Sequence, residues 1–161
     1  MNLYTGESAD AFFGGDVPPA VHALLHRAAT ATPEERTALL WSAQALAPTC
    51  LANYYVLYKH HAGRREFELA ERAASRGLQE AAAQAGLHSD WRQVPAPLPA
   101  AVAQTEPGRF WLFTLKALAF ISLRSGQPGQ ARTLLAHLEA CGPDAHIGGD
   151  VTAALLEAVK P

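Results

Sequence analysis

The strongest constraint on the fold is the stretch from Leu115 to Pro143, in which two apolar helical patterns flank a short turn. Leucines and small residues recur in it at intervals of three and four, the spacing that places side chains on one face of a helix. Gly126 suits the left-handed residue that ends a helix, and Pro128 suits the first turn of the next one. The stretch is therefore predicted to form a helical hairpin.

This hairpin resembles a tetratricopeptide repeat, a unit of about 34 residues built from two antiparallel helices. The positions of the repeat's Leu-Gly pair, turn glycine, small residue and closing proline are held by Leu118-Ala119, Gly126, Ala131 and Pro143. The sequence departs from the pattern in having Ala119 in place of glycine and Ser122 in place of a large aromatic residue. The resemblance implies an all-α superhelix of stacked helical hairpins, with about seven helices and a C-terminal capping helix.

Along the chain, the helical patterns and their breaks predict a single domain of 161 residues. We expect an irregular N-terminal arm, a degenerate first repeat, a second repeat, an irregular proline-rich excursion, a third repeat and a capping helix. In that order they occupy residues 1–15, 16–48, 49–86, 87–108, 109–143 and 149–160. The clearest helix start is Thr32-Pro33-Glu34-Glu35, which combines a capping hydroxyl, a proline and a carboxylate three residues on.

The second repeat is expected to contain a helix ending at Ala62-Gly63 and a long helix from Arg64 to Ala85. Charged residues recur every four positions on one face of the long helix, whereas alanine and glycine dominate the other. Small residues let helix backbones approach closely, as stacked helical pairs require. The excursion that follows contains four prolines and should be held by Trp91, with a mobile tip near residues 95–99.

Composition excludes several classes of partner. The net charge is −2 and the charges are spread along the chain, so we expect no nucleic-acid or membrane partner. The N-terminus lacks a secretory signal and the sequence lacks a long apolar run, which favours a cytoplasmic location. Cys50 and Cys141 are expected to be thiols at helix ends rather than a disulfide.

No catalytic constellation is evident in the sequence. His22 and His26 lie four residues apart, a spacing that can bind zinc, but no third ligand accompanies them. His60 and His61 are adjacent and should point apart on a helix. No serine or cysteine stands in a nucleophile motif, and no phosphate-binding loop is present. We therefore expect no enzyme activity, no metal and no cofactor.

The resemblance also implies a concave groove lined by the first helices of successive repeats. Transferring that geometry places six residues on the groove wall: Tyr55, Lys59, Phe113, Lys116, Phe120 and Arg124. Aromatic and cationic side chains are typical anchors of interfaces. Alternatively, Tyr55, Phe113 and Phe120 pack against the Trp91 excursion or against Phe12-Phe13 of the N-terminal arm, and the sequence leaves both interpretations open.

The expected function is a non-enzymatic adaptor that binds a protein or peptide in this groove, or that forms a homodimer through it. The alternatives are an accessory protein that binds a small molecule or metal, and an enzyme of unfamiliar design. The segments YYVLYKHH, GLHSDW and LKALAFISLRSG resemble small repeat proteins encoded beside bacterial nitrogen-fixation genes. That likeness would link the accessory role to nitrogen-fixation metabolism.

Overall fold

The structure is a computed structural model that describes residues 17–141, and within this range the chain is all-α with no strand. It contains seven α-helices: α2 (Pro19–Ala29), α3 (Pro33–Leu46), α4 (Leu51–Gly63), α5 (Phe67–Ala85), α6 (Ala100–Ala103), α7 (Glu106–Arg124) and α8 (Pro128–Cys141). A 3-10 turn, η1 (Trp91–Gln93), lies between α5 and α6. The prediction of an all-α fold is confirmed for this range. The N-terminal arm and the expected capping helix at 149–160 lie outside it.

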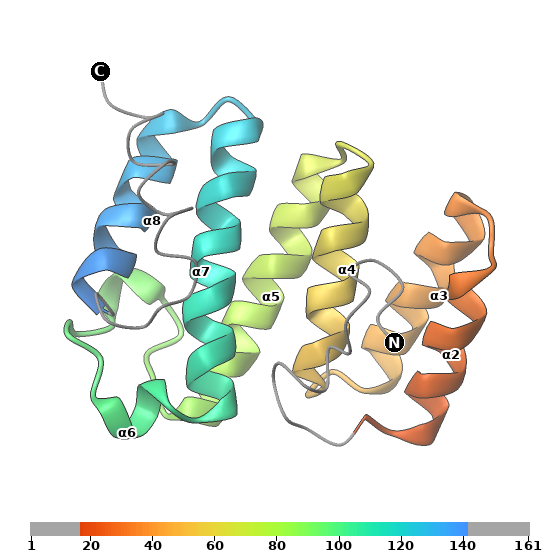
Figure 1. Ribbon diagram of the computed structural model, residues 1–161, viewed down its shortest axis with the longest axis horizontal. Helices are drawn as coiled ribbons and strands as arrows, with labels where there is room; N and C mark the ends of the chain where they lie inside the picture. Colours follow the sequence, from red (N-terminus) through yellow and green to blue (C-terminus); the bar gives the residue numbers. More distant parts are fainter. Residues whose placement is uncertain (1–16, 142–161) are drawn as a thin grey trace.

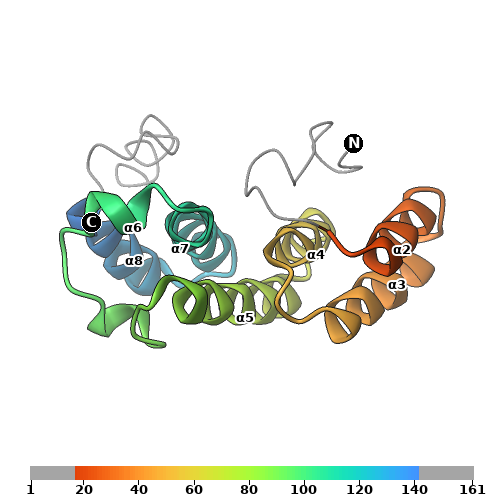
Figure 2. The ribbon, with the colours of Figure 1, turned by 90° about the horizontal axis from the view of Figure 1, so that it is seen from below.

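The longer helices pack as adjacent pairs, α2 with α3, α4 with α5, and α7 with α8 (Figure 1). Figure 2 shows that α2, α4 and α7 lie along one side of the molecule, and α3, α5 and α8 along the other. Helix α5 contacts both α4 and α7, whereas α4 and α7 touch each other only briefly. Helix α5 therefore supports two helices whose facing sides remain partly separate. In the portion covered by the structure, no helix has the length and apolarity needed to cross a membrane.

Small side chains on α5 allow this double contact. The buried face of α5 consists of Ala70, Ala73, Ala74, Gly77, Leu78, Ala81 and Ala82. A Cβ atom added at Gly77 would lie 2.8 Å from Cβ of Tyr54 on α4 and 3.2 Å from a ring carbon of Phe110 on α7. The absent side chain at Gly77 therefore lets both neighbouring helices approach α5 at the same level.

Local signals fix the helix ends where the sequence predicts them. Thr32 and Glu35 form the expected capping box, with each backbone N–H donating to the other residue's side chain at 3.3 Å. Gly126 adopts a left-handed conformation with φ of +80° between α7 and α8. Pro128 begins α8. These predictions are confirmed.

Two helix boundaries differ from the prediction. Helix α5 begins at Phe67 rather than at Arg64, because the chain reverses through Arg65, whose φ is +61°. Helix α7 begins at Glu106, inside the segment expected to be irregular. The Thr105 side chain accepts a hydrogen bond from the Gly108 N–H at 3.1 Å, which caps this end of α7.

The proline-rich excursion is fastened by more than Trp91. Val94 and Leu98 are both buried, and the Leu98 N–H donates to the carbonyl oxygen of Cys141 at 2.9 Å. The expected free tip is therefore tied to the end of α8. The half-buried Trp91 packs its ring against His137 of α8, with the ring centroids 5.4 Å apart.

Candidate binding groove

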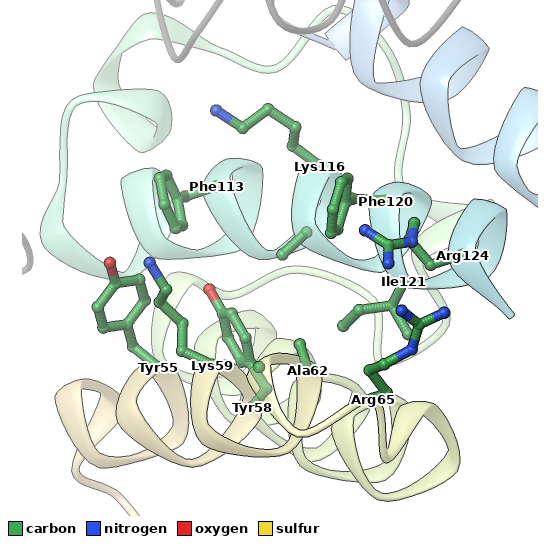
Figure 3. A pocket seen from close by; sticks show the side chains of 12 residues that line it. Tyr55, Tyr58, Lys59, Ala62, Arg65, Phe113, Lys116, Phe120, Ile121 and Arg124 are labelled. Carbon is green, nitrogen blue, oxygen red and sulfur yellow. The ribbon is translucent and has the colours of Figure 1, made fainter. Parts of the chain in front are cut away.

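A groove with a volume of about 590 Å³ opens between α4 and α7 (Figure 3). All six residues that the sequence places on a groove wall line it: Tyr55, Lys59, Phe113, Lys116, Phe120 and Arg124. The lining comes from α4, from the turn that follows α4, and from α7. Helix α5 determines the spacing of the two walls because both pack against it. The structure thus brings together residues that are up to 69 positions apart in the sequence.

The deep part of the groove is aromatic and neutral. Tyr58 is buried, and its hydroxyl lies 3.5 Å from Oγ1 of Thr114 on α7. Burial raises the pKa of Tyr58, so this phenol stays protonated at neutral pH. The Tyr55 ring is only 4% exposed and packs against Tyr58 and Phe113, with centroid separations of 5.6 Å to each. Tyr55 is therefore a buried part of the wall.

Cationic side chains lie over aromatic rings along the rim. The Lys59 amine lies 5.5 Å from the centroid of the Tyr55 ring, and the Lys116 amine lies 4.9 Å from that of Phe113. The Arg124 guanidinium lies 5.7 Å from the ring of Phe120. Such cation–π contacts hold a charged group in place beside an aromatic ring.

The groove is electropositive. Its lining contains Lys59, Arg65, Lys116 and Arg124, and no carboxylate from residues 17–141 is part of it. Burial lowers the pKa of Lys116, because removing an ammonium group from water disfavours its charged form. A carboxylate placed beside Lys116 would oppose that effect. The chemistry of this site therefore favours an anionic ligand.

Phe120 gives the groove an exposed aromatic surface. Its side chain is 40% exposed, and among the residues that the structure covers only Leu46, at 58%, is a comparably exposed large hydrophobic residue. Leu46 is the last residue of α3 and lies outside the groove lining. The excursion contributes no residue to the groove lining either. Phe12-Phe13, the other expected cover, lies outside the residues described.

Six further residues line the groove: Tyr58, Ala62, Gly63, Arg65, Ala117 and Ile121. Tyr58 and Ala62 continue the face of α4 that carries Tyr55, and Ala117 and Ile121 continue the face of α7 that carries Phe113. The i+3 and i+4 rule could have found these four. The other two are Gly63, the last residue of α4, and Arg65, which stands in the turn after α4, where helical spacing gives no guidance.

A second cluster of polar side chains lies at the end of α4. His60, His61 and Glu66 bring nitrogen and oxygen atoms within 4.8 Å of one another, and they form the one group of metal-ligand type found among residues 17–141. His22 and His26 on α2 are not part of it.

Hydrogen bonds explain this cluster without a metal. The indole N–H of Trp41 donates to Nε2 of His61 at 3.0 Å, and Nδ1 of His61 therefore donates to Glu66 at 3.1 Å. Arg64 donates to the same Glu66 oxygen at 2.9 Å. The hydrogen bond from His61, followed by that from Arg64, lowers the pKa of Glu66. Both nitrogens of the buried His61 ring are thus engaged, and a metal would have to displace one of these bonds.

Both cysteines within the described range are free thiols at helix ends, as expected. Cys50 precedes α4, and Cys141 ends α8. Burial raises the pKa of Cys141, which makes its thiol a poor nucleophile.

No protein-family model matches this chain, and searches of curated proteins and of solved structures find no significant similarity. The function is therefore inferred from the geometry and chemistry of the groove.

Proposed function

We propose that this chain is a protein-interaction adaptor that binds a segment of a partner protein in the groove between α4 and α7. The observation that carries the proposal is the groove of about 590 Å³ with aromatic residues on both walls and a 40% exposed Phe120 at its rim. Exposed aromatic and cationic side chains around a recess are typical of interface anchors. Tyr55 and Tyr58 provide a rigid base beneath these anchors.

The arrangement of the helical pairs supports a tetratricopeptide-like basis for this function. Helices α4 and α7 are each the first helix of a pair, and both lie on the same side of α5 (Figure 2). In tetratricopeptide proteins the first helices of successive pairs line the peptide-binding surface. A second copy of this chain is one partner that such a surface could accept.

The proposal can be tested by site-specific photocrosslinking. A benzoylphenylalanine residue is introduced at Phe120 and, in a matched control, at Leu46, the other exposed large hydrophobic position. We expect discrete adducts in extracts of the source cells at position 120 and none at position 46. Equal crosslinking at both positions, or none at either, would argue against the groove as a binding surface.

Reversing the charge of Lys116 tests whether this residue contacts the partner without contributing much to the stability of the fold. Lys116→Glu should abolish the adducts formed at position 120 and leave the melting temperature within a few degrees of wild type, because Lys116 lies at the groove rim. Arg72→Glu on the exposed face of α5 makes the same charge change outside the groove and should preserve the adducts. Adducts that persist in Lys116→Glu would contradict the assignment of the groove.

A small anionic molecule is a second candidate ligand, favoured by the volume of the groove, which falls in the range of small-molecule sites. An accessory protein of this kind should show a thermal shift with one class of anionic metabolite. Lys116→Glu should remove that shift.

A further inference from the structure

We infer that the segment bound in this groove is acidic, with carboxylates placed on both sides of an apolar or aromatic anchor residue. The inference rests on the proposed function and adds the chemistry of the partner to it. It follows from the distribution of charge, from the way the cations are held, and from the apolar space between the two walls.

The positive charge of the groove is a local feature. The whole chain carries 13 Lys and Arg against 15 Asp and Glu, for a net charge of −2. Four of those basic residues line this one groove, and none of the acidic residues in the structurally described part of the chain joins them. A cleft lined by one sign of charge favours a ligand of the opposite sign and repels the wrong one.

The cations come from both walls of the groove, and one of them, Arg124, is the last residue of α7. Lys59 comes from α4 and its amine points toward Phe113 of α7, whereas the amine of Lys116 lies on the opposite side of that ring, 4.9 Å from its centroid (Figure 3). The guanidinium of Arg124 lies 5.7 Å from the rings of both Phe67 and Phe120, which limits its freedom. Guanidinium groups held in this way are suited to carboxylates because their planar N–H donors match two carboxylate oxygens.

The centre of the groove suits an apolar side chain. Ala62 of α4 and Ala117 of α7 line it with short side chains, whereas Phe113 and Phe120 lie on either side of Ala117 along α7. Ile121 lines the groove on the same helix and is almost fully buried. An aromatic or large aliphatic side chain placed between the phenyl rings would have carboxylate-binding groups on both sides.

The inference can be tested by panning the full-length protein against a library of random 12-residue peptides. The peptides retained by wild-type protein should carry an excess of Asp and Glu around a large apolar residue. For the most enriched peptide, Lys59→Glu with Arg124→Glu should weaken binding at least tenfold in fluorescence anisotropy. Arg72→Glu with Arg76→Glu on α5, which makes the same total charge change outside the groove, should weaken it less than threefold.

The outcomes distinguish this inference from the proposed function. Peptides that are neutral or basic but are lost when Phe120 is changed to serine would overturn the acidic partner and keep the groove as a binding site. If no enriched peptide depends on Phe120, both proposals fail.

The chain's own residues 1–16 are the competing occupant, because they contain Glu7, Asp10, Asp16 and Phe12-Phe13 and no lysine or arginine. If the full-length variant Phe12→Ser with Phe13→Ser enriches acidic peptides and the wild type does not, the occupant is this arm and the inference of a separate acidic partner is overturned. Equal enrichment by both proteins supports the separate partner.

Discussion

His60 and His61 are adjacent in α4 and have different hydrogen-bond partners. The Thr37 hydroxyl donates to the carbonyl oxygen of Pro33 at 3.0 Å, so at 2.7 Å from Nε2 of His60 it can only accept. His60 therefore carries its proton on Nε2, whereas the Trp41 indole requires an acceptor on Nε2 of His61. The two imidazoles connect α4 to two successive turns of α3.

This network predicts a pH dependence of stability. Burial, followed by the neighbouring His61 and Arg64, lowers the pKa of His60 to about 4, below the ordinary value of 6.5. The pKa of His60 is lower in the folded state than in the unfolded state. The contribution of the neutral His60 side chain to stability is therefore complete above pH 6.5 and is lost as the pH falls toward 4. His60→Gln retains an N–H donor but does not titrate. The free energy of unfolding of both proteins falls between pH 7 and pH 4. The fall should be smaller for His60→Gln than for wild type, by about 1–3 kcal/mol.

Urea unfolding at several pH values measures this difference. His26→Gln, which changes an exposed histidine on α2, is the matched control and should follow the wild-type curve. Parallel curves for His60→Gln and wild type would show that His60 is not held in its neutral form.

At the scale of the elements, α5 depends on its small face. Gly77 lies where Tyr54 and Phe110 both approach the helix backbone. Alanine at this position would favour the helix by about 1 kcal/mol relative to glycine. Its Cβ atom would nevertheless lie 2.8 Å from the Tyr54 Cβ, and overpacking of this kind costs about 1–3 kcal/mol.

The expected result for Gly77→Ala is a net loss of up to about 2 kcal/mol in the free energy of unfolding. Gly63→Ala is the control, because a Cβ atom at Gly63 would meet nothing within 4 Å. That variant should be neutral or slightly more stable than wild type. Urea unfolding measures the free energy of unfolding of both variants. If Gly77→Ala were as stable as Gly63→Ala, the close packing of α4 and α7 on α5 would be refuted.

The sequence predicts helix ends well where local chemistry determines them. The capping box at Thr32 and the left-handed Gly126 depend on residues a few positions apart. The start of α5 could not be predicted in this way, because Arg64, Arg65 and Glu66 are all compatible with a helix. They form a turn, and the contact of Glu66 with His61 lies across that turn.

At the scale of the whole molecule, the groove remains because α4 and α7 pack against α5 more than against each other. Six of its lining residues were expected there from the resemblance of the sequence to a tetratricopeptide repeat. The sequence could not show that Tyr55 is buried while Phe120 is 40% exposed, because exposure depends on the distance between two helices that a third one holds. The position of Leu98 could not be predicted for the same reason, because its N–H donates to the carbonyl oxygen of Cys141, a residue far away in the sequence.

The central claim is that the groove between α4 and α7 is where this chain binds its partner. The most direct measurement is amide chemical-shift mapping of the 17.2 kDa chain titrated with the peptide most enriched in panning, whatever the charge of that peptide. We predict that the largest shifts cluster in residues 51–65 and 110–124, with little change in α2 or on the exposed face of α5. Shifts concentrated on those outer surfaces, with the groove residues unchanged, would contradict the account.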